Sequence, residues 1–295
     1  MAVAPEFFPR IRRDESMARH TSWHVGGPAE VYFQPRDRQD LYAFLNTLAP
    51  DVPLTWLGLG SNILVRDGGV PGVVIATQGA LGRLERRSAN IVMVEAGVPC
   101  ARLARQCTKW GLGPAEFFAG IPGTIGGALA MNAGAFGGDT WSHVSEVEVV
   151  DRNGRCTTRT PEEYEIGYRK ARGPADDEWF LSAQLRFERR PASGQMQEML
   201  DRRKASQPIG EWSCGSVFTN PPGDHAARLI ESAGLKGLRV GGAVVSEKHA
   251  NFILNEGSAT AAEIEELMAQ VQECVYATHG VLLSPEVRIL GEPTA

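Results

Sequence analysis

The chain has 295 residues, of which 43% are hydrophobic and 22% charged, as is typical of a globular protein with one to three domains. A net charge of −5 without any basic block argues against a nucleic-acid partner. The first residues lack the apolar core of a signal peptide and no run of about 18 apolar residues occurs, so we expect a cytoplasmic protein without a membrane partner.

Residues 1–76 alternate strands with a helix, which predicts a small α/β subdomain. Pro50 and Pro53 end the helix, and Asp67-Gly68-Gly69 is expected to form a turn. The expected elements are strands at 29–35, 54–60, 63–65 and 72–77, and a helix at 36–48.

Residues 77–189 predict a second α/β subdomain. Pro99 is expected at the first position of a helix, and Asn153-Gly154 is expected to turn a β-hairpin. The apolar stretch 111–138 holds 9 of the 33 glycines, which indicates close backbone approach in a packed structure rather than a linker. The expected elements are strands at 91–97 and 180–188, a helix at 101–110 and the hairpin at 146–160.

Residues 190–295 predict a third region, joined by a linker at Pro191, Ser193 and Gly194. Thr260-x-x-Glu263 is a capping-box pattern ahead of a long amphipathic helix, which Gly280 is expected to end. The other expected elements are helices at 195–205 and 224–235 and strands at 251–255 and 281–290.

The five cysteines include no C-x-x-C pair and are odd in number, which argues against a disulfide framework or a zinc ribbon. The sequence also lacks H-E-x-x-H or a comparable cluster, so no metal is expected. We expect all five cysteines to be small buried side chains, namely Cys100, Cys107, Cys156, Cys214 and Cys274.

Two glycine-rich loops are candidates for binding phosphate. The first, Gly58-Leu59-Gly60-Ser61-Asn62, follows an apolar strand, and the second, residues 120–127, precedes an apolar stretch that could begin a helix. Glycines let backbone N–H groups converge on an anion, and a helix N-terminus adds its dipole, although both loops could equally be tight turns. Neither loop matches G-x-G-x-x-G or the P-loop pattern, so a Rossmann or P-loop site is not supported.

Four side chains are candidates for chemistry, and each also has an ordinary structural explanation. Ser216 lies in a constrained Gly-Ser-Val loop that does not match G-x-S-x-G, so a hydrolase nucleophile is not expected. Glu286, in the expected last strand, is either a solvated edge residue or a functionally buried one. Arg169 beside Tyr168 could be a surface pair, and His249 is a weak candidate alone.

Taken together, segments from about Thr21 to Gly291 resemble one family, the UDP-N-acetylenolpyruvoylglucosamine reductases. Their order and spacing make the resemblance specific. The matching segments are Thr21-Ser-Trp-His-Val-Gly-Gly-Pro-Ala, Leu57-Gly-Leu-Gly-Ser-Asn-Ile-Leu-Val, Gly120-Ile-Pro-Gly-Thr-Ile-Gly-Gly-Ala-Leu-Ala-Met-Asn-Ala-Gly-Ala-Phe-Gly, Gly167-Tyr-Arg, Gly215-Ser-Val-Phe-Thr-Asn-Pro, Ala233-Gly-Leu-Lys-Gly, Val245-Ser-Glu-Lys-His-Ala-Asn-Phe-Ile-Leu-Asn and Ser284-Pro-Glu-Val-Arg.

The resemblance implies an α/β (α+β) fold with an FAD-binding domain of the vanillyl-alcohol-oxidase type and a C-terminal α/β substrate domain. The FAD-binding domain would comprise two subdomains, 1–76 and 77–189, and the substrate domain would be 190–295. FAD would bind without a covalent link. The residues expected to bind it are Leu57, Gly58, Gly60, Ser61, Asn62, Gly120, Ile121, Pro122, Gly123, Thr124, Gly126, Gly127, Asn132, Ala133 and Gly134.

The resemblance further implies that hydride passes from NADPH through FAD to the enolpyruvyl group of a UDP-sugar, in the synthesis of a peptidoglycan precursor. Ser216 would supply a proton to the resulting enolate. Arg169 and Glu286 would polarise the substrate carboxylate, and Glu286 would do so only in its protonated form.

Substrate contacts and family type follow from the same resemblance. Tyr168, Asn220 and His249 match substrate-contacting positions. Many members carry Lys directly before Gln-Pro, where this chain has Ser206, and Lys204 could substitute for it. The short span after Arg169 indicates the family type without an extra Tyr-containing substrate loop, and a monomer is expected.

Two other functions remain open at this point. An FAD oxidase of the same superfamily often tethers its flavin through His or Cys, but His20, His24 and His143 lie in no motif recognised for that. A nucleotide-binding module without enzymatic activity would keep the glycine loops and would not need Ser216, Arg169 and Glu286 together.

Overall fold

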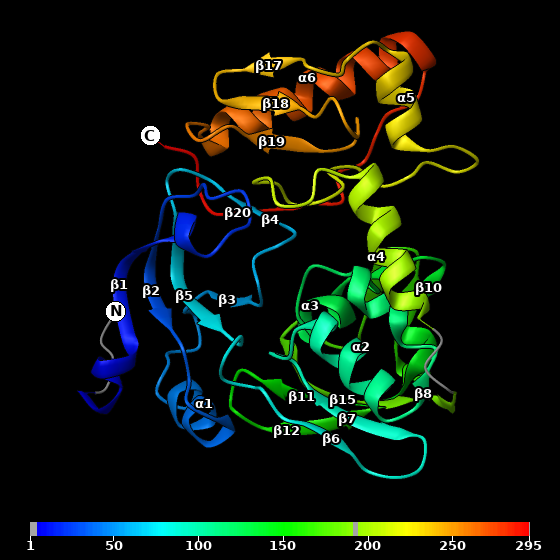
Figure 1. Cartoon of the computed structure of the whole chain (residues 1–295). Helices are drawn as coiled ribbons and strands as arrows, with labels where there is room; N and C mark the ends of the chain where they lie inside the picture. The colour runs from blue at the N-terminus through cyan, green and yellow to red at the C-terminus, as the bar shows by residue number, and fades with distance from the viewer. Residues whose placement is uncertain (1–4, 191–193, 295) are drawn as a thin grey trace. The chain divides into compact units, whose positions relative to one another are not determined.

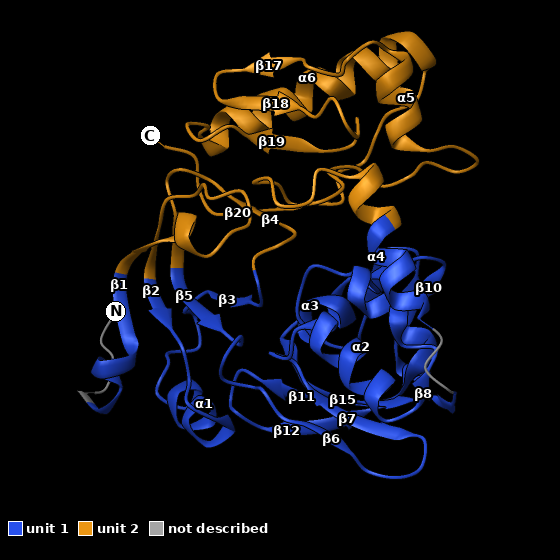
Figure 2. Ribbon diagram, in the orientation of Figure 1, with its two compact units in different colours: residues 1–13, 31–59, 72–201 blue, residues 14–30, 60–71, 202–295 orange. Residues whose placement is uncertain are grey.

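The structure is a computed structural model that describes residues 5–190 and 194–294 (Figure 1). The chain divides into two compact units, each assembled from three separate segments (Figure 2). Unit 1 comprises Met1–Arg13, Val31–Leu59 and Gly72–Asp201, and unit 2 comprises Asp14–Glu30, Gly60–Pro71 and Arg202–Ala295.

Helices and strands are both present in each unit. The α-helices are α1 (Arg38–Leu45), α2 (Cys100–Lys109), α3 (Ile125–Ala130), α4 (Gln195–Ser206), α5 (Ala226–Ser232) and α6 (Ala261–His279). Short 3-10 helices span Pro5–Arg10, Met17–Arg19, Glu116–Gly120, Trp141–His143 and Pro161–Glu163. The strands are β1 (Ile11–Ser16), β2 (Pro28–Phe33), β3 (Leu54–Leu57), β4 (Ile63–Val65), β5 (Val70–Ala76), β6 (Leu84–Arg86), β7 (Ile91–Glu95), β8 (Leu112–Gly113), β9 (Gly134–Ala135), β10 (Gly138–Asp139), β11 (Val144–Asp151), β12 (Cys156–Arg159), β13 (Glu165–Gly167), β14 (Lys170–Arg172), β15 (Glu178–Arg186), β16 (Glu188–Arg189), β17 (Arg239–Val240), β18 (Ala243–Val245), β19 (Ile253–Asn255) and β20 (Arg288–Leu290).

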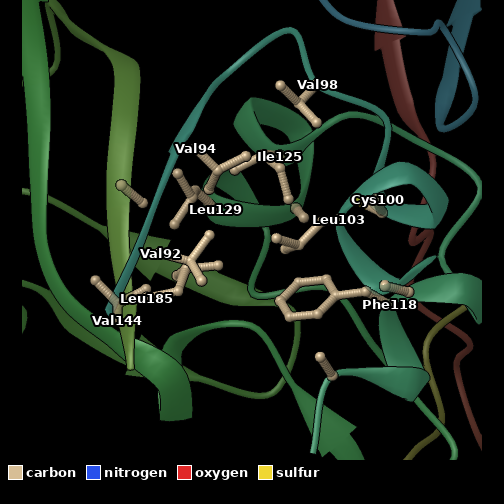
Figure 3. Close-up of a cluster of buried hydrophobic side chains, with 14 of the residues drawn as sticks. Val92, Val94, Val98, Cys100, Leu103, Phe118, Ile125, Leu129, Val144 and Leu185 are labelled. Carbon is tan, nitrogen blue, oxygen red and sulfur yellow. The ribbon is translucent and has the colours of Figure 1, made fainter. Parts of the chain in front are cut away.

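A five-stranded antiparallel sheet in the order β12-β11-β15-β7-β6 is the largest sheet of unit 1. The expected hairpin is confirmed as β11–β12, and Gly154 in its turn has the left-handed φ of +71° that glycine accepts most readily. Helices α2 and α3 cover one face of this sheet, and Figure 3 shows Val92, Leu103, Phe118 and Leu185 in the shared core. Burying each such large side chain stabilises the fold by roughly 1.5–3 kcal/mol.

A four-stranded sheet runs in the order β1-β2-β5-β3, with β3 parallel to β5. The unit 1 residues of this sheet pack with α1 in a second core. Phe33 and Phe44 stack there with ring centroids 3.8 Å apart, and Phe7 meets both rings edge-on. Strand β3 packs against this core through Leu54 and Trp56, and its C-terminal end leads directly into the first glycine-rich loop.

Unit 2 is built on the antiparallel sheet β17-β18-β19, which packs against α6, and on the parallel pair β20–β4. The capping box is confirmed, because the Thr260 hydroxyl accepts from the Glu263 N–H and the Glu263 carboxylate accepts from the Thr260 N–H. The expected end at Gly280 is also confirmed by its left-handed φ of +68°. Trp23, fully buried, joins this core and donates from its indole N–H to the Ile253 carbonyl over 2.7 Å.

Several expectations about elements were wrong. Residues 281–290 form a strand only from Arg288, because the backbone of the preceding residues pairs with the 217–219 loop and Pro285 has no N–H to donate. Pro99 is the residue before helix α2 rather than its first residue. Cys156 and Cys274 are exposed, whereas the other three cysteines are buried as expected. Of the expected linker, Pro191 and Ser193 lie outside the described residues.

Candidate active site

The two glycine-rich loops meet inside unit 1. A Cβ atom on Gly58 would lie 2.3 Å from the Thr124 hydroxyl oxygen, a distance that no real side chain tolerates. A side chain at position 58 would displace the Thr124 hydroxyl, so glycine lets the loop after β3 approach the loop before α3 with this hydroxyl in place. The structure thus brings together two candidate segments that are more than sixty residues apart in sequence.

Several hydrogen-bond donors at this meeting point have no acceptor in the part of the chain that the structure describes. Among the described residues, no acceptor lies in bonding geometry with the backbone N–H groups of Gly58, Leu59 or Thr124. Thr124 is only 1% exposed, and its hydroxyl has no partner within residues 5–190 and 194–294. Leaving such a buried group unsatisfied costs about 1–3 kcal/mol, so these donors indicate a ligand with strong acceptors.

The first loop continues into unit 2, where a segment near the N-terminus contacts it. A Cβ atom on Gly60 would lie 1.8 Å from the His20 carbonyl oxygen, and the Ser22 N–H donates to the Gly60 carbonyl over 3.1 Å. The Ser22 hydroxyl is buried and has no partner among the described residues. Ser22 was not among the predicted site residues, although it lies in the family-matching segment that starts at Thr21.

Arg169 lies in the two-residue turn of the β13–β14 hairpin and has a positive φ of +55°. This backbone conformation costs a non-glycine residue roughly 1–2 kcal/mol, so the surroundings must hold it in place. The Asn132 amide provides one such contact by donating to the Gly167 carbonyl over 3.1 Å while accepting from the Trp141 N–H over 3.0 Å. The guanidinium of Arg169 reaches the Gly134 carbonyl at 3.4 Å.

The contacts of Arg169 bring together two groups of expected site residues. Asn132 and Gly134 were expected to bind the cofactor, and Tyr168 and Arg169 the substrate. The Tyr168 side chain is 60% exposed, and its ring centroid lies 5.3 Å from the Arg169 guanidinium carbon. A cation held over an aromatic ring and beside a carbonyl is positioned to receive a carboxylate or phosphate.

In unit 2, the Ser216 loop meets the Glu286 segment through the backbone. The Glu286 N–H donates to the Val217 carbonyl over 2.7 Å. The Asn62 side chain, at the end of the first glycine-rich loop, donates to the Glu286 carbonyl over 3.1 Å. Ser216 and Glu286 are both half-buried. Three of the expected site segments therefore converge within this unit, whereas Arg169 belongs to unit 1.

Charge and burial near this point act on a neighbouring thiol. Burial raises the pKa of Cys214 well above its ordinary value, and Glu286 raises it further when its carboxyl group is ionised. Cys214 therefore stays a neutral thiol beside the Ser216 loop. Cys214 packs as a small hydrophobic residue in the core of unit 2 that also contains Leu64.

Asn251 is the second residue that sequence reasoning missed. Its amide nitrogen donates to the Phe218 carbonyl over 2.8 Å, and its amide oxygen accepts from the Phe218 N–H over 3.0 Å. Its own carbonyl accepts from the Val217 N–H over 2.9 Å. In the sequence, Asn251 could be noticed only because it lies in a segment that matches the family. The residues to which it bonds could not be inferred from the sequence.

The remaining expected substrate residues lie in unit 2. Asn220 accepts the Ala226 N–H at the start of α5. His249 is half-buried with its Nδ1 unpartnered among the described residues, and burial lowers its pKa. The Lys204 side chain is exposed, and the backbone carbonyl of Lys204 accepts from the Lys248 ammonium over 2.6 Å.

The described residues contain neither a cluster of metal ligands nor a helix that could span a membrane. They contain no group of three or more His, Cys, Asp or Glu side chains able to hold a metal ion. Within 5–190 and 194–294, no helix has both the length and the apolarity of a membrane span.

Comparison with known families identifies both parts of the chain. A family model described as FAD binding domain matches residues 29–159. A second, described as UDP-N-acetylenolpyruvoylglucosamine reductase, C-terminal domain, matches residues 207–290.

Relatives and a solved structure cover nearly the whole chain. UDP-N-acetylenolpyruvoylglucosamine reductases from Alkalilimnicola ehrlichii and Methylococcus capsulatus are 59% and 57% identical, covering 96% and 95% of this chain and 95% and 93% of theirs. The crystal structure of the enzyme from Thermus caldophilus is 35% identical with a TM-score of 0.83, covering 96% of this chain and 99% of that one. The expected α/β (α+β) fold with an FAD-binding domain of the vanillyl-alcohol-oxidase type is confirmed. The chain belongs to the UDP-N-acetylenolpyruvoylglucosamine reductase family.

Proposed function

We propose that the chain is an FAD-dependent oxidoreductase that uses NADPH to reduce UDP-N-acetylglucosamine enolpyruvate to UDP-N-acetylmuramate in peptidoglycan precursor synthesis. Membership of the family supports this reaction. The observation that carries most weight is the hydrogen-bonded convergence of the Ser216 loop, the Glu286 segment and the end of the first glycine-rich loop at Asn62.

The residues at the two loops fit an FAD pyrophosphate. Gly58 and Gly60 leave no room for a side chain, so the loop presents bare backbone N–H groups. The Thr124 hydroxyl, which has no partner among the described residues, adds a donor of the kind that phosphate oxygens accept. The cofactor contacts expected of residues 57–62, 120–127 and 132–134 stay predictions, and FAD is proposed to bind without a covalent link.

The active-site side chains each have one task in the proposed reaction. Bound FAD supplies hydride transfer from NADPH to the terminal carbon of the enolpyruvyl double bond. The Ser216 hydroxyl gives a proton to the adjacent carbon, so that one hydride and one proton are added across the double bond. Arg169 stabilises the substrate carboxylate on which negative charge develops, and Glu286 in its protonated form donates a hydrogen bond to the same group.

The strained turn at Arg169 supports its role in binding the substrate. Folding spends about 1–2 kcal/mol to hold this residue at positive φ, where Gly or Asn would be relaxed. Tyr168, Asn220, His249 and Lys204 are proposed as substrate contacts. The Asn220 amide oxygen accepts from the Ala226 N–H over 3.1 Å at the start of α5, which holds this side chain in place.

Location, assembly and domain division are proposed on the same basis. The substrate is a water-soluble sugar nucleotide and NADPH is a cytoplasmic reductant, so we place the enzyme in the cytoplasm, as a monomer. The division into 1–76, 77–189 and 190–295 stays a prediction, separate from the two units defined by contacts.

Stopped-flow measurement of the two half-reactions of Ser216→Ala tests the function. Reduction of bound FAD by NADPH should proceed within about twofold of the wild-type rate. Reoxidation by the enolpyruvyl UDP-sugar should slow by roughly a hundred- to thousand-fold, because the proton donor is lost. The matched control is Ser213→Ala, three residues away in the same loop. Reoxidation of Ser216→Ala at the wild-type rate would refute the assignment.

A further inference from the structure

We propose that Asn251 is a positioning residue that sets the orientation of the Ser216 hydroxyl. The inference rests on the proposed role of Ser216 as proton donor. Asn251 is 4% exposed and makes three hydrogen bonds to Val217 and Phe218, the two residues that directly follow Ser216. Through these bonds it acts on the reacting group by way of the backbone, so it is a positioning residue and not itself a catalytic one.

The Asn251 amide pairs with Phe218 in the manner of a neighbouring strand. Its NH₂ group donates to the Phe218 carbonyl over 2.8 Å, and its oxygen accepts from the Phe218 N–H over 3.0 Å. Only a side chain with a donor and an acceptor side by side makes both bonds. A carboxylate keeps the bond to the N–H but meets the carbonyl with another acceptor.

The loop after Ser216 is held from a second direction by the Glu286 segment. The Glu286 N–H donates to the Val217 carbonyl over 2.7 Å, and Phe218 forms an isolated β-bridge with Pro285. The same short stretch therefore links Ser216 to Glu286 and to Asn251. Removing the two side-chain bonds of Asn251 would loosen Phe218, while the backbone bonds of Val217 to Asn251 and Glu286 stay in place.

The residue before Ser216 provides little orientation. Gly215 has a left-handed φ of +83°, and a Cβ built on it would meet no atom within 4 Å. Ser216 therefore lies between a glycine in open surroundings and two residues fixed by hydrogen bonds. Its direction is set from the C-terminal side, where Asn251 acts.

The size of the effect follows from the precision that proton transfer requires. A displacement of about 1 Å caused by a substitution outside the chemistry can slow a reaction about 100-fold. We expect Asn251→Asp to reduce the rate of flavin reoxidation by the enolpyruvyl UDP-sugar by roughly 10- to 100-fold. NADPH reduction of bound FAD should stay within about twofold of wild type, because that step uses no proton from Ser216.

Asn255→Asp is a matched control for loss of a buried amide. Asn255 is 7% exposed in the same unit, four residues further on, and its amide donates to the Trp23 carbonyl over 2.8 Å and accepts from the Gly257 and Ala259 N–H groups. The control should lower thermal stability without changing the ratio of the two half-reaction rates. Equal slowing of reoxidation in both variants, or equal slowing of both half-reactions in Asn251→Asp, would overturn the inference.

The double variant with Ser216→Ala separates this inference from the proposed function. If Asn251 acts through Ser216, Asn251→Asp adds less than about threefold slowing in the Ser216→Ala background. A slow Ser216→Ala with a normal Asn251→Asp defeats only the role of Asn251, whereas a normal Ser216→Ala defeats the proton-donor assignment and this inference with it. If Asn251→Asp fails to retain FAD, the two half-reaction rates are measured in Asn251→Ser instead. The same results then support or overturn the inference.

Discussion

At the scale of single residues, the buried hydroxyl of Thr124 distinguishes a ligand contact from a packing contact. Its oxygen has no partner among the described residues and lies 2.3 Å from the position that a Cβ on Gly58 would take. In a protein built only for stability, such a hydroxyl would be replaced by a methyl group. An unsatisfied group that persists at a loop junction is therefore evidence for a function.

Thr124→Val exchanges this hydroxyl for a methyl group of similar size. We expect the FAD dissociation constant to rise about tenfold, which corresponds to about 1.4 kcal/mol for one hydrogen bond. The apoprotein should be no less stable, because the substitution removes an unsatisfied buried group. Fluorescence titration with FAD and urea denaturation of the apoprotein measure the two effects.

The control for stability is Thr140→Val, whose hydroxyl is buried and donates to the Ala133 carbonyl over 2.7 Å. Loss of this satisfied bond should destabilise the apoprotein by about 1 kcal/mol. Equal destabilisation by the two substitutions, with unchanged FAD affinity in Thr124→Val, would contradict the ligand contact.

Residue chemistry was predictable from the sequence where it depended on local pattern and not where it depended on distant partners. The glycine loops were identified because closely spaced glycines after a strand predict exposed backbone donors. The contacts of Ser22 with Gly60, and of Asn251 with Phe218, join residues that are more than thirty positions apart. No spacing rule specifies such a pair in a single sequence.

At the scale of elements, helix α6 was the most predictable because its two ends are encoded locally. Thr260 and Glu263 complete a capping box, and Gly280 takes the left-handed conformation after the last turn. The last strand was predicted too long, because Pro285 and the partners of residues 284–286 in the 217–219 loop interrupt it. Strands of two or three residues, such as β8 and β9, are too short to show alternation.

The start of α6 also has a second cap that the sequence did not reveal. The two carboxylate oxygens of Asp67 accept from the Ala261 and Ala262 N–H groups, each over 3.0 Å. Asp67→Ala leaves both N–H groups without their charged acceptor. We expect it to destabilise unit 2 by about 1–3 kcal/mol, more than the ~1 kcal/mol of a single cap such as Thr260→Ala.

Hydrogen exchange of the α6 amides measures this difference directly. Faster exchange in α6 of Asp67→Ala than of Thr260→Ala, with unchanged exchange in α2, is the expected pattern. Asp67→Asn, which keeps one acceptor oxygen, should fall between Asp67→Ala and wild type. An Asp67→Ala protein with wild-type exchange in α6 would show that the carboxylate contributes nothing.

At the scale of the whole molecule, the order of short motifs along the chain was enough to identify the family, whereas the division into contact units was not predictable. Each unit is assembled from three separate segments, because its cores join residues from distant parts of the chain. The first glycine-rich loop passes from unit 1 into unit 2 between Leu59 and Gly60. Its first glycine packs on Thr124 in unit 1, and its second packs on His20 in unit 2.

The contact of Gly58 with Thr124 predicts that FAD stabilises unit 1. A ligand that binds only the native loop stabilises the fold by about 2.7 kcal/mol when its free concentration is 100 times its dissociation constant. Because Gly58 and Thr124 both belong to unit 1, unfolding of that unit should disrupt the site that they form. Adding FAD to the apoprotein should therefore slow hydrogen exchange of the most protected amides in α2. Unchanged exchange in α2 would mean that the junction of Gly58 with Thr124 plays no part in holding the cofactor.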